Sequence, residues 1–121
     1  MVVGVALAGA LGALARYAVH HAVQSRTTSR FPFGTAVVNI SGALALGFLT
    51  GLFLYHGLAP DARVIVATGF LGAYTTFSSF SYETLGLRRA DAPVAALMNA
   101  FGSIAVGLLA AAAGLGLAGL V

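Results

Sequence analysis

Four apolar blocks, separated by short polar breaks, set the strongest limit on what this chain can fold into. They cover approximately residues 2–22, 35–55, 64–87 and 94–120 of the sequence. Each is long enough for the ~20 residues that a helix needs to cross a bilayer core about 30 Å thick. The breaks are too short to hold a soluble domain. The sequence therefore predicts an all-α, multi-pass membrane protein with a single four-helix transmembrane domain over residues 1–121.

Composition argues against several other classes of protein. Charged residues make up 7% of the chain, whereas soluble domains carry about 25%, so the chain could not cover a water-facing surface. The positive residues form no continuous basic stripe, so no nucleic-acid partner is expected. The three acidic residues, Asp61, Glu83 and Asp91, each lie at or near a loop, and there is no cysteine. Because catalysis needs a nucleophile with a base or paired carboxylates, we do not expect an enzyme.

Small residues at helical spacing predict close packing between helices. Helices in lipid gain little from the hydrophobic effect when they meet, so they associate through small residues that let backbones approach. Such residues recur every four positions in three blocks: Gly4, Ala8 and Gly12; Gly47 and Gly51; Ser103 and Gly107. Four small helices can hardly enclose a water-lined path. A channel or transporter of this size should therefore be an oligomer, and a dimer is the simplest closed form.

The third block concentrates hydrogen-bonding capacity in the stretch GAYTTFSSFSYET, residues 72–84. Ser and Thr compete for backbone hydrogen bonds and so bend or unwind helices. We expect the helix to break near residues 72–76, which would free carbonyls on one half-helix and N–H groups on the next. Phe77 and Phe80 would share a face of the second half. Such a pair is commonly core packing, but ring edges beside hydroxyl donors would favour a small anion.

Polar residues inside the other blocks leave two interpretations open. Asn39 lies one turn beyond Thr35, and Asn99 lies one turn before Ser103. Polar groups at membrane depth find partners or line a cavity, so each Asn could equally join two helices or face a substrate. Arg16, within the first block, could extend to the interface or attract anions in a vestibule.

Three segments resemble the signature segments of the fluoride channels called Fluc or CrcB: GALGALARY (9–17), PFGTAVVNISGALALG (32–47) and TGFLGAYTTFSSFSYE (68–83). The resemblance covers essentially the whole chain in length, helix count and motif order. It implies a fluoride-selective channel of the bacterial plasma (inner) membrane, which exports cytoplasmic fluoride passively and relieves its toxicity. It also implies an antiparallel, dual-topology dimer with two fluoride pathways and a central Na⁺ that is structural and not transported.

The same resemblance implies roles for individual residues. A fluoride pathway would use an amide donor, ring edges, hydroxyls, a vestibule charge and a carboxylate near a pore end: Asn39, Phe77, Phe80, Thr76, Ser78, Ser103, Arg16 and Glu83. The Na⁺ would bind backbone carbonyls of Gly72 and Thr75, two from each subunit. The chain departs from the family pattern in the fourth block, where Asn99 and Gly107 stand in place of a Tyr and a further hydroxyl.

A small multidrug or cation transporter is the main alternative, because antiparallel four-helix dimers occur there too. Such a transporter would need a membrane-embedded carboxylate to exchange protons against cargo, and Glu83 is the one candidate. The interior is rich in donors and poor in acceptors, which favours an anion.

The distribution of Arg residues predicts a preferred orientation in the membrane. Loops one and three carry Arg26, Arg30, Arg88 and Arg89, whereas the opposite side carries Arg63. The positive-inside rule places loops one and three in the cytoplasm. A homodimer with both orientations is the first expectation, and a heterodimer with an oppositely oriented paralogue is the alternative that this bias raises.

Overall fold

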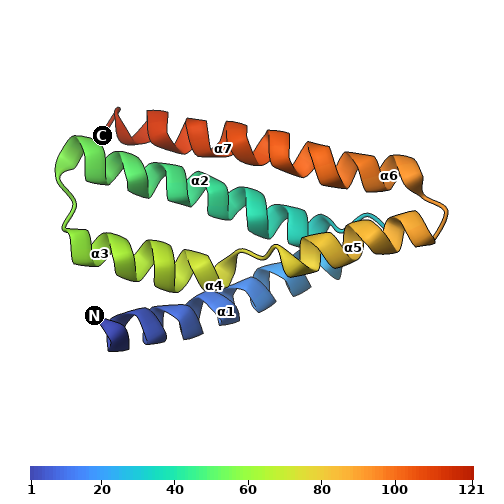
Figure 1. The fold of residues 1–121 in the computed structure, drawn as a ribbon, viewed down its shortest axis with the longest axis horizontal. Helices are drawn as coiled ribbons and strands as arrows, with labels where there is room; N and C mark the ends of the chain where they lie inside the picture. Colours follow the sequence, from blue (N-terminus) through green and yellow to red (C-terminus); the bar gives the residue numbers. More distant parts are fainter.

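The chain folds into four long helical rods, and the computed structural model describes all residues from 1 to 121 (Figure 1). The first two rods are α1 (Val2–Gln24) and α2 (Phe33–His56). The third runs from Pro60 to Arg89 and the fourth from Pro93 to Ala118. All four are long and apolar enough to cross a membrane. The predicted all-α class with four spans is thereby confirmed.

The third and fourth rods are composite. The third consists of α3 (Pro60–Val64), the π-helix η1 (Ile65–Leu71), α4 (Gly72–Tyr74) and α5 (Ser78–Arg89). The fourth consists of α6 (Pro93–Leu97), the π-helix η2 (Met98–Gly102) and α7 (Ser103–Ala118). The two π-helical segments were not predicted, because an apolar pattern does not distinguish a wide helical turn from an ordinary one. Such segments are frequent at functional sites.

The third helix is broken, as predicted, and the break covers residues 75–77, which overlap the C-terminal part of the expected range 72–76. Thr75 has an extended backbone, with φ −79° and ψ 158°, and the thin connection between α4 and α5 is visible in Figure 1. The Thr75 N–H still donates to the Leu71 carbonyl at 3.0 Å. The helix therefore continues through Gly72 and ends one turn later than the glycine suggested.

Local sequence chemistry explains several helix ends. The α2 helix ends before Gly57, whose φ of 66° lies in the left-handed region that glycine adopts without a steric penalty. Pro60 and Pro93 are the first residues of α3 and α6. An N–H at that position has no partner within the helix, so proline, which lacks one, fits there. Both chain termini and the loop after α2 lie at one end of the molecule, and the other two loops lie at the opposite end (Figure 1).

Close backbone approaches hold the rods together. The α2 helix packs most extensively against α7, and α1 packs against η1 and α4. A Cβ at Gly47 would collide with the carbonyl of Ala111, and one at Gly114 with the carbonyl of Leu44. Gly12 approaches the Phe70 backbone in the same way. Helix packing through these glycines, predicted for the first and second blocks, is thereby confirmed.

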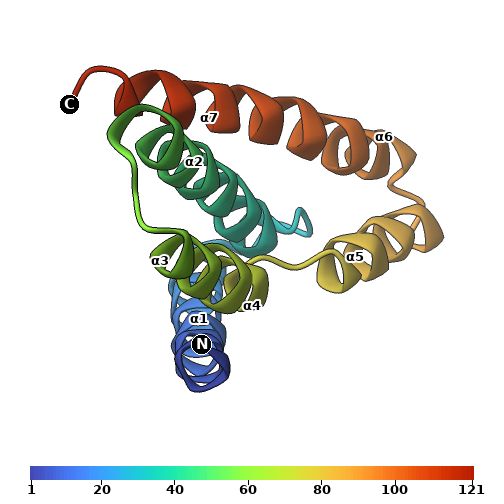
Figure 2. The same ribbon diagram turned by 60° about the vertical axis from the view of Figure 1, so that its left-hand side comes forward.

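The fourth rod behaves differently along its length. A Cβ at Gly107 would meet nothing within 4 Å, so the face of Ser103 and Gly107 does not pack closely on another helix of this chain. Figure 2 shows that α5 runs toward α6 and away from α1. The bundle is therefore tight along α2 and α7 and open around α5.

A matched pair of glycines on α7 tests this packing. Gly114→Ala should destabilise the protein by about 1–3 kcal/mol, because the added methyl overpacks a helix contact. Gly116→Ala should be neutral or stabilising, since nothing lies within 4 Å of a Cβ there. Thermal unfolding of the purified variants in detergent measures both. Equal stability of the two variants would contradict the close approach of α2 and α7.

Candidate functional site

The break in the third helix is held open by the side chain of Asn39 on α2. Its Nδ2 donates to the Thr76 carbonyl at 2.7 Å, and its Oδ1 accepts from the Thr76 N–H at 2.8 Å. Backbone polar groups have no water to bond in a bilayer, so an opened helix needs such a substitute partner. The amide therefore joins α2 to the break. Its second N–H is not used by either bond and is free for another acceptor.

Hydroxyl groups complete the two ends of the break. The Thr75 hydroxyl donates to the Leu71 carbonyl at 2.9 Å, and the Ser79 N–H donates to the Thr76 hydroxyl at 3.2 Å. The Thr76 and Ser78 hydroxyls lie 3.4 Å apart. The density of Ser and Thr in this segment is therefore explained in part by the capping of two half-helices, as the competition of hydroxyls for backbone bonds leads one to expect.

Carbonyl groups at the end of α4 are left without backbone partners. None of the backbone hydrogen bonds outside the helices ends on the carbonyls of Gly72, Ala73 or Tyr74. Normally the N–H of Thr76 would bond to Gly72, but it bonds to Asn39 instead. The end of α4 therefore presents acceptors, while α5 begins with N–H and hydroxyl donors.

A cavity of about 450 Å³ opens beside the break, and we call it the break cavity. Its polar wall comes from three rods: α2, the segment around the break, and α7. It brings together most of the residues predicted for the site: Asn39, Gly72, Thr75, Thr76, Phe77, Phe80 and Ser103. Apolar side chains form the remainder, so the few donors converge in a largely apolar pocket, which is typical of binding sites.

The two phenylalanines lie next to each other at this cavity. Their ring centroids are 6.0 Å apart and their planes are tilted by 40°. Phe80 is half-buried, whereas Phe77 is 79% exposed. The pair is therefore not part of a closed core within one chain, and its outer side is open.

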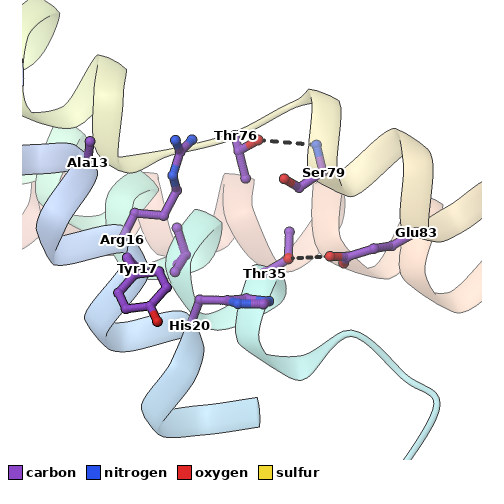
Figure 3. A pocket seen from close by; sticks show the side chains of 9 residues that line it. Ala13, Arg16, Tyr17, His20, Thr35, Thr76, Ser79 and Glu83 are labelled. Atoms are coloured by element: carbon purple, nitrogen blue, oxygen red, sulfur yellow. Dashed lines mark hydrogen bonds between the residues drawn. The ribbon is translucent and has the colours of Figure 1, made fainter.

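A second, smaller cavity of about 230 Å³ lies among α1, α2 and α5, and we call it the arginine cavity (Figure 3). Arg16, Thr76 and Glu83 line it, together with Thr35 and His20. Thr76 borders both cavities. The two polar spaces therefore meet at the residue that Asn39 holds in place.

The charged residues of the arginine cavity face inward. Arg16 Nη1 donates to the Thr75 carbonyl at 3.4 Å, so its guanidinium points to the break rather than to the membrane surface. Thr35 donates to Glu83 Oε1 at 3.0 Å, as Figure 3 shows. The other carboxylate oxygen, Oε2, is buried without a hydrogen-bond partner. Of the residues predicted for the fluoride pathway, Ser78 alone lines neither cavity.

A hydrogen bond between polar side chains of α5 and η2 was not predicted from the sequence. Asn99 is 1% exposed and donates through Nδ2 to the Thr84 hydroxyl at 2.7 Å. Of the two interpretations left open for Asn99, the link between helices is confirmed. Thr84 was not considered beforehand, and Thr35 was noted only for its spacing from Asn39. The signal was their spacing, because Thr84 follows Phe80 by four residues and Thr35 precedes Asn39 by four.

Comparison with known proteins gives the family. The family model described as CrcB-like protein, Camphor Resistance (CrcB), matches residues 3–115. The fluoride-specific ion channel FluC 1 of Leifsonia xyli is 45% identical over 120 residues, which are 99% of this chain and 88% of that protein. The fluoride-specific ion channel FluC of Nitratidesulfovibrio vulgaris is 46% identical over 116 residues, 95% of this chain and 94% of that protein. A fluoride-specific ion channel FluC of Thermus thermophilus is 45% identical over 115 residues, 95% of this chain and 91% of that protein. This chain therefore belongs to the CrcB-like family.

Proposed function

We propose that this chain forms a fluoride-selective channel, through which cytoplasmic fluoride leaves a bacterial cell passively, so that its toxicity is relieved. The observation that carries this proposal is the break cavity, where Asn39, Phe80 and Ser103 converge from three different helices. The names of the relatives support the same ion. The four apolar helices make the chain a multi-pass protein of the cell membrane.

The chemistry of the cavity suits a small anion. Fluoride holds water tightly, so a pore must replace that water with close donors. The free N–H of Asn39 and the hydroxyls of Thr76 and Ser103 are such donors. Ring edges of Phe77 and Phe80 add partial positive charge without offering a binding site to a cation. A larger anion such as chloride would be excluded by size where the path is narrow.

A cation transporter fits these groups less well. Glu83 is the carboxylate that would have to exchange protons against a cation, yet one of its oxygens accepts from Thr35. Arg16 lines the same cavity, and its fixed positive charge opposes the entry of a cation. We therefore keep the anion channel as the proposed function.

A second copy of the chain completes the proposed pathway. Within one chain Phe77 is 79% exposed, and the face of Ser103 and Gly107 lacks a close neighbour. An antiparallel homodimer would cover these groups and close the break cavity. The loop before α2 and the loop after α5 lie at one end of the fold, and the loop between α2 and α3 lies at the other (Figure 1). Four Arg residues lie in or next to the first two of these loops and Arg63 lies in α3, so a heterodimer with an oppositely oriented paralogue is the alternative assembly.

We also propose a structural Na⁺ between the two copies. Gly72 lies in α4 and Thr75 directly follows it, and both residues line the break cavity. Carbonyls freed by a helix break are suitable ligands for Na⁺. These two groups are too few to surround a Na⁺, and the Thr75 carbonyl already accepts from Arg16. A complete ligand shell would therefore require carbonyls from the second subunit.

Reconstitution tests the proposed function directly. Protein purified and inserted into liposomes should release fluoride, but not chloride, when a potassium ionophore provides the counter-ion current. An ion-selective electrode for each anion measures the two fluxes. Equal flux of both anions, or proton-coupled movement of a cation, would reject the proposal.

Two substitutions test the residues of the break cavity. Phe80→Ile removes a ring edge and keeps apolar bulk, so fluoride flux should fall strongly while the protein stays folded. Asn39→Ala should lower both flux and stability, because it leaves the Thr76 N–H and carbonyl unpaired. Each unpaired group costs about 1–3 kcal/mol of stability. Phe48→Ile is the matched control, since Phe48 is also half-buried but lines neither cavity. Wild-type flux in Phe80→Ile would assign that ring to packing.

The proposed Na⁺ predicts a dependence of assembly on this ion. Dimers measured by analytical ultracentrifugation should be more stable in Na⁺ than in N-methylglucamine. Thr75→Ser should be nearly silent because serine keeps both the carbonyl and the hydroxyl that donates to Leu71, whereas Gly72→Val should weaken assembly. Dimer stability and flux that do not change on Na⁺ removal would argue against the site.

A further inference from the structure

A chain of side-chain hydrogen bonds connects two walls of the break cavity. Ser103 on α7 donates to Asn99 Oδ1 at 3.3 Å, and Asn99 Nδ2 donates to the Thr84 hydroxyl at 2.7 Å. The Thr84 hydroxyl in turn donates to the Phe80 carbonyl at 2.7 Å. The series therefore runs from the fourth rod to the second half of the third rod. Its two end residues, Ser103 and Phe80, both line the break cavity.

Chemistry fixes the direction of every bond in this chain. A carbonyl can only accept, so the single proton of Thr84 must go to Phe80. Thr84 must then accept from Asn99, which orients the amide with its NH₂ group toward α5. The amide oxygen is left for Ser103, whose hydroxyl donates to it. Hydrogen bonds aligned in one direction polarise and strengthen one another.

Asn99 lies behind the cavity and not in it. Its side chain is 1% exposed, and it lines neither the break cavity nor the arginine cavity. It belongs to the π-helical segment η2, immediately before Ser103 at the start of α7. Contacts of α5 with the rest of the molecule are mainly with α6 and η2. The amide is therefore placed to set how far the Phe80 wall stands from the Ser103 wall.

We propose that Asn99 is a positioning residue for the permeating anion, acting through Thr84 and Ser103 without touching the ion. This inference rests on the proposed function, because it concerns the width and the donors of the same cavity. The bond from Ser103 to Asn99 is the longest of the three. The Ser103 hydroxyl is thus the member released most readily, so it can turn from Asn99 to an anion and return. Asn99 both holds this donor in register and anchors the backbone of Phe80.

Variants that interrupt the chain at two different bonds test this role. Asn99→Leu and Thr84→Val each remove hydrogen bonding and retain bulk. Fluoride flux per folded protein should fall about tenfold in either variant, the scale expected when one buried hydrogen bond is lost and its partner is left unpaired. The double variant should lose no more flux than the worse single variant, because both break one series. Thr84→Ser keeps the hydroxyl and should retain flux.

Thr50→Val is the matched control. The Thr50 hydroxyl also donates to the carbonyl four residues earlier, that of Leu46 at 2.8 Å, but it belongs to no chain of bonds. The fluoride flux of Thr50→Val should be that of the wild type.

Two outcomes would overturn the inference. In the first, Asn99→Leu lowers the melting temperature but leaves flux per folded protein intact, as a purely structural role would predict. In the second, the losses of flux in the double variant are additive. If Asn99→Leu does not fold, the comparison of fluoride flux between Thr84→Val and Thr84→Ser tests the inference by itself. Absence of fluoride flux in the wild type would reject the proposed function itself.

Discussion

The exchange of two hydrogen bonds between the Asn39 amide and the Thr76 backbone is the interaction on which the site depends. A side-chain amide carries the same donor and acceptor as a peptide group, so one residue restores both backbone bonds that Thr76 loses. In a bilayer no water can do this, and each unsatisfied group costs several kcal/mol. Without this partner the N–H and the carbonyl of Thr76 would both be left unpaired. The break cavity and the positions of Phe77 and Phe80 depend on the break in the third helix.

The four rods contribute unequally to this arrangement. Along α2 and α7 the backbones touch through Gly47 and Gly114, so that pair forms a rigid support. The second half of the third rod, α5, lacks such contacts with α2 and is tied to η2 by polar groups instead, through Thr84 and Asn99. Helix packing thus positions the α2 and α7 side of the break cavity, and hydrogen bonds position the α5 side. Polar links between membrane helices typically contribute only about 1 kcal/mol each, so the α5 side is the more adjustable one.

The sequence predicted much of the fold and of the candidate site. It failed for features that depend on contacts between residues far apart in the chain. Apolar length predicted the spans, and the small-residue repeats of the first two blocks predicted helix contacts, because those signals are local; the repeat of Ser103 and Gly107 makes no such contact within the chain. The break itself was expected from the hydroxyl density around Thr76, but its position shifted because the competing partner, Asn39, comes from another helix. For the same reason the residue pattern alone did not distinguish Asn39 from Asn99, since each is a single amide in an apolar block, and only the family resemblance assigned Asn39 to the pathway. The structure shows Asn39 both bonded to the break and lining the cavity, while Asn99 is buried behind it. The roles of these residues in transport stay predictions.

The polar interruption that forms the site also affects how the chain enters the membrane during synthesis. The third rod is the least apolar of the four by mean hydropathy, so it is the hardest to transfer into lipid on its own. Its partner Asn39 lies on the second rod, which is made and inserted earlier. Arg16, which donates to the Thr75 carbonyl, lies on the first. The order of the helices along the chain therefore means that the groups needed to solvate the interrupted segment are already in the bilayer when that segment leaves the ribosome.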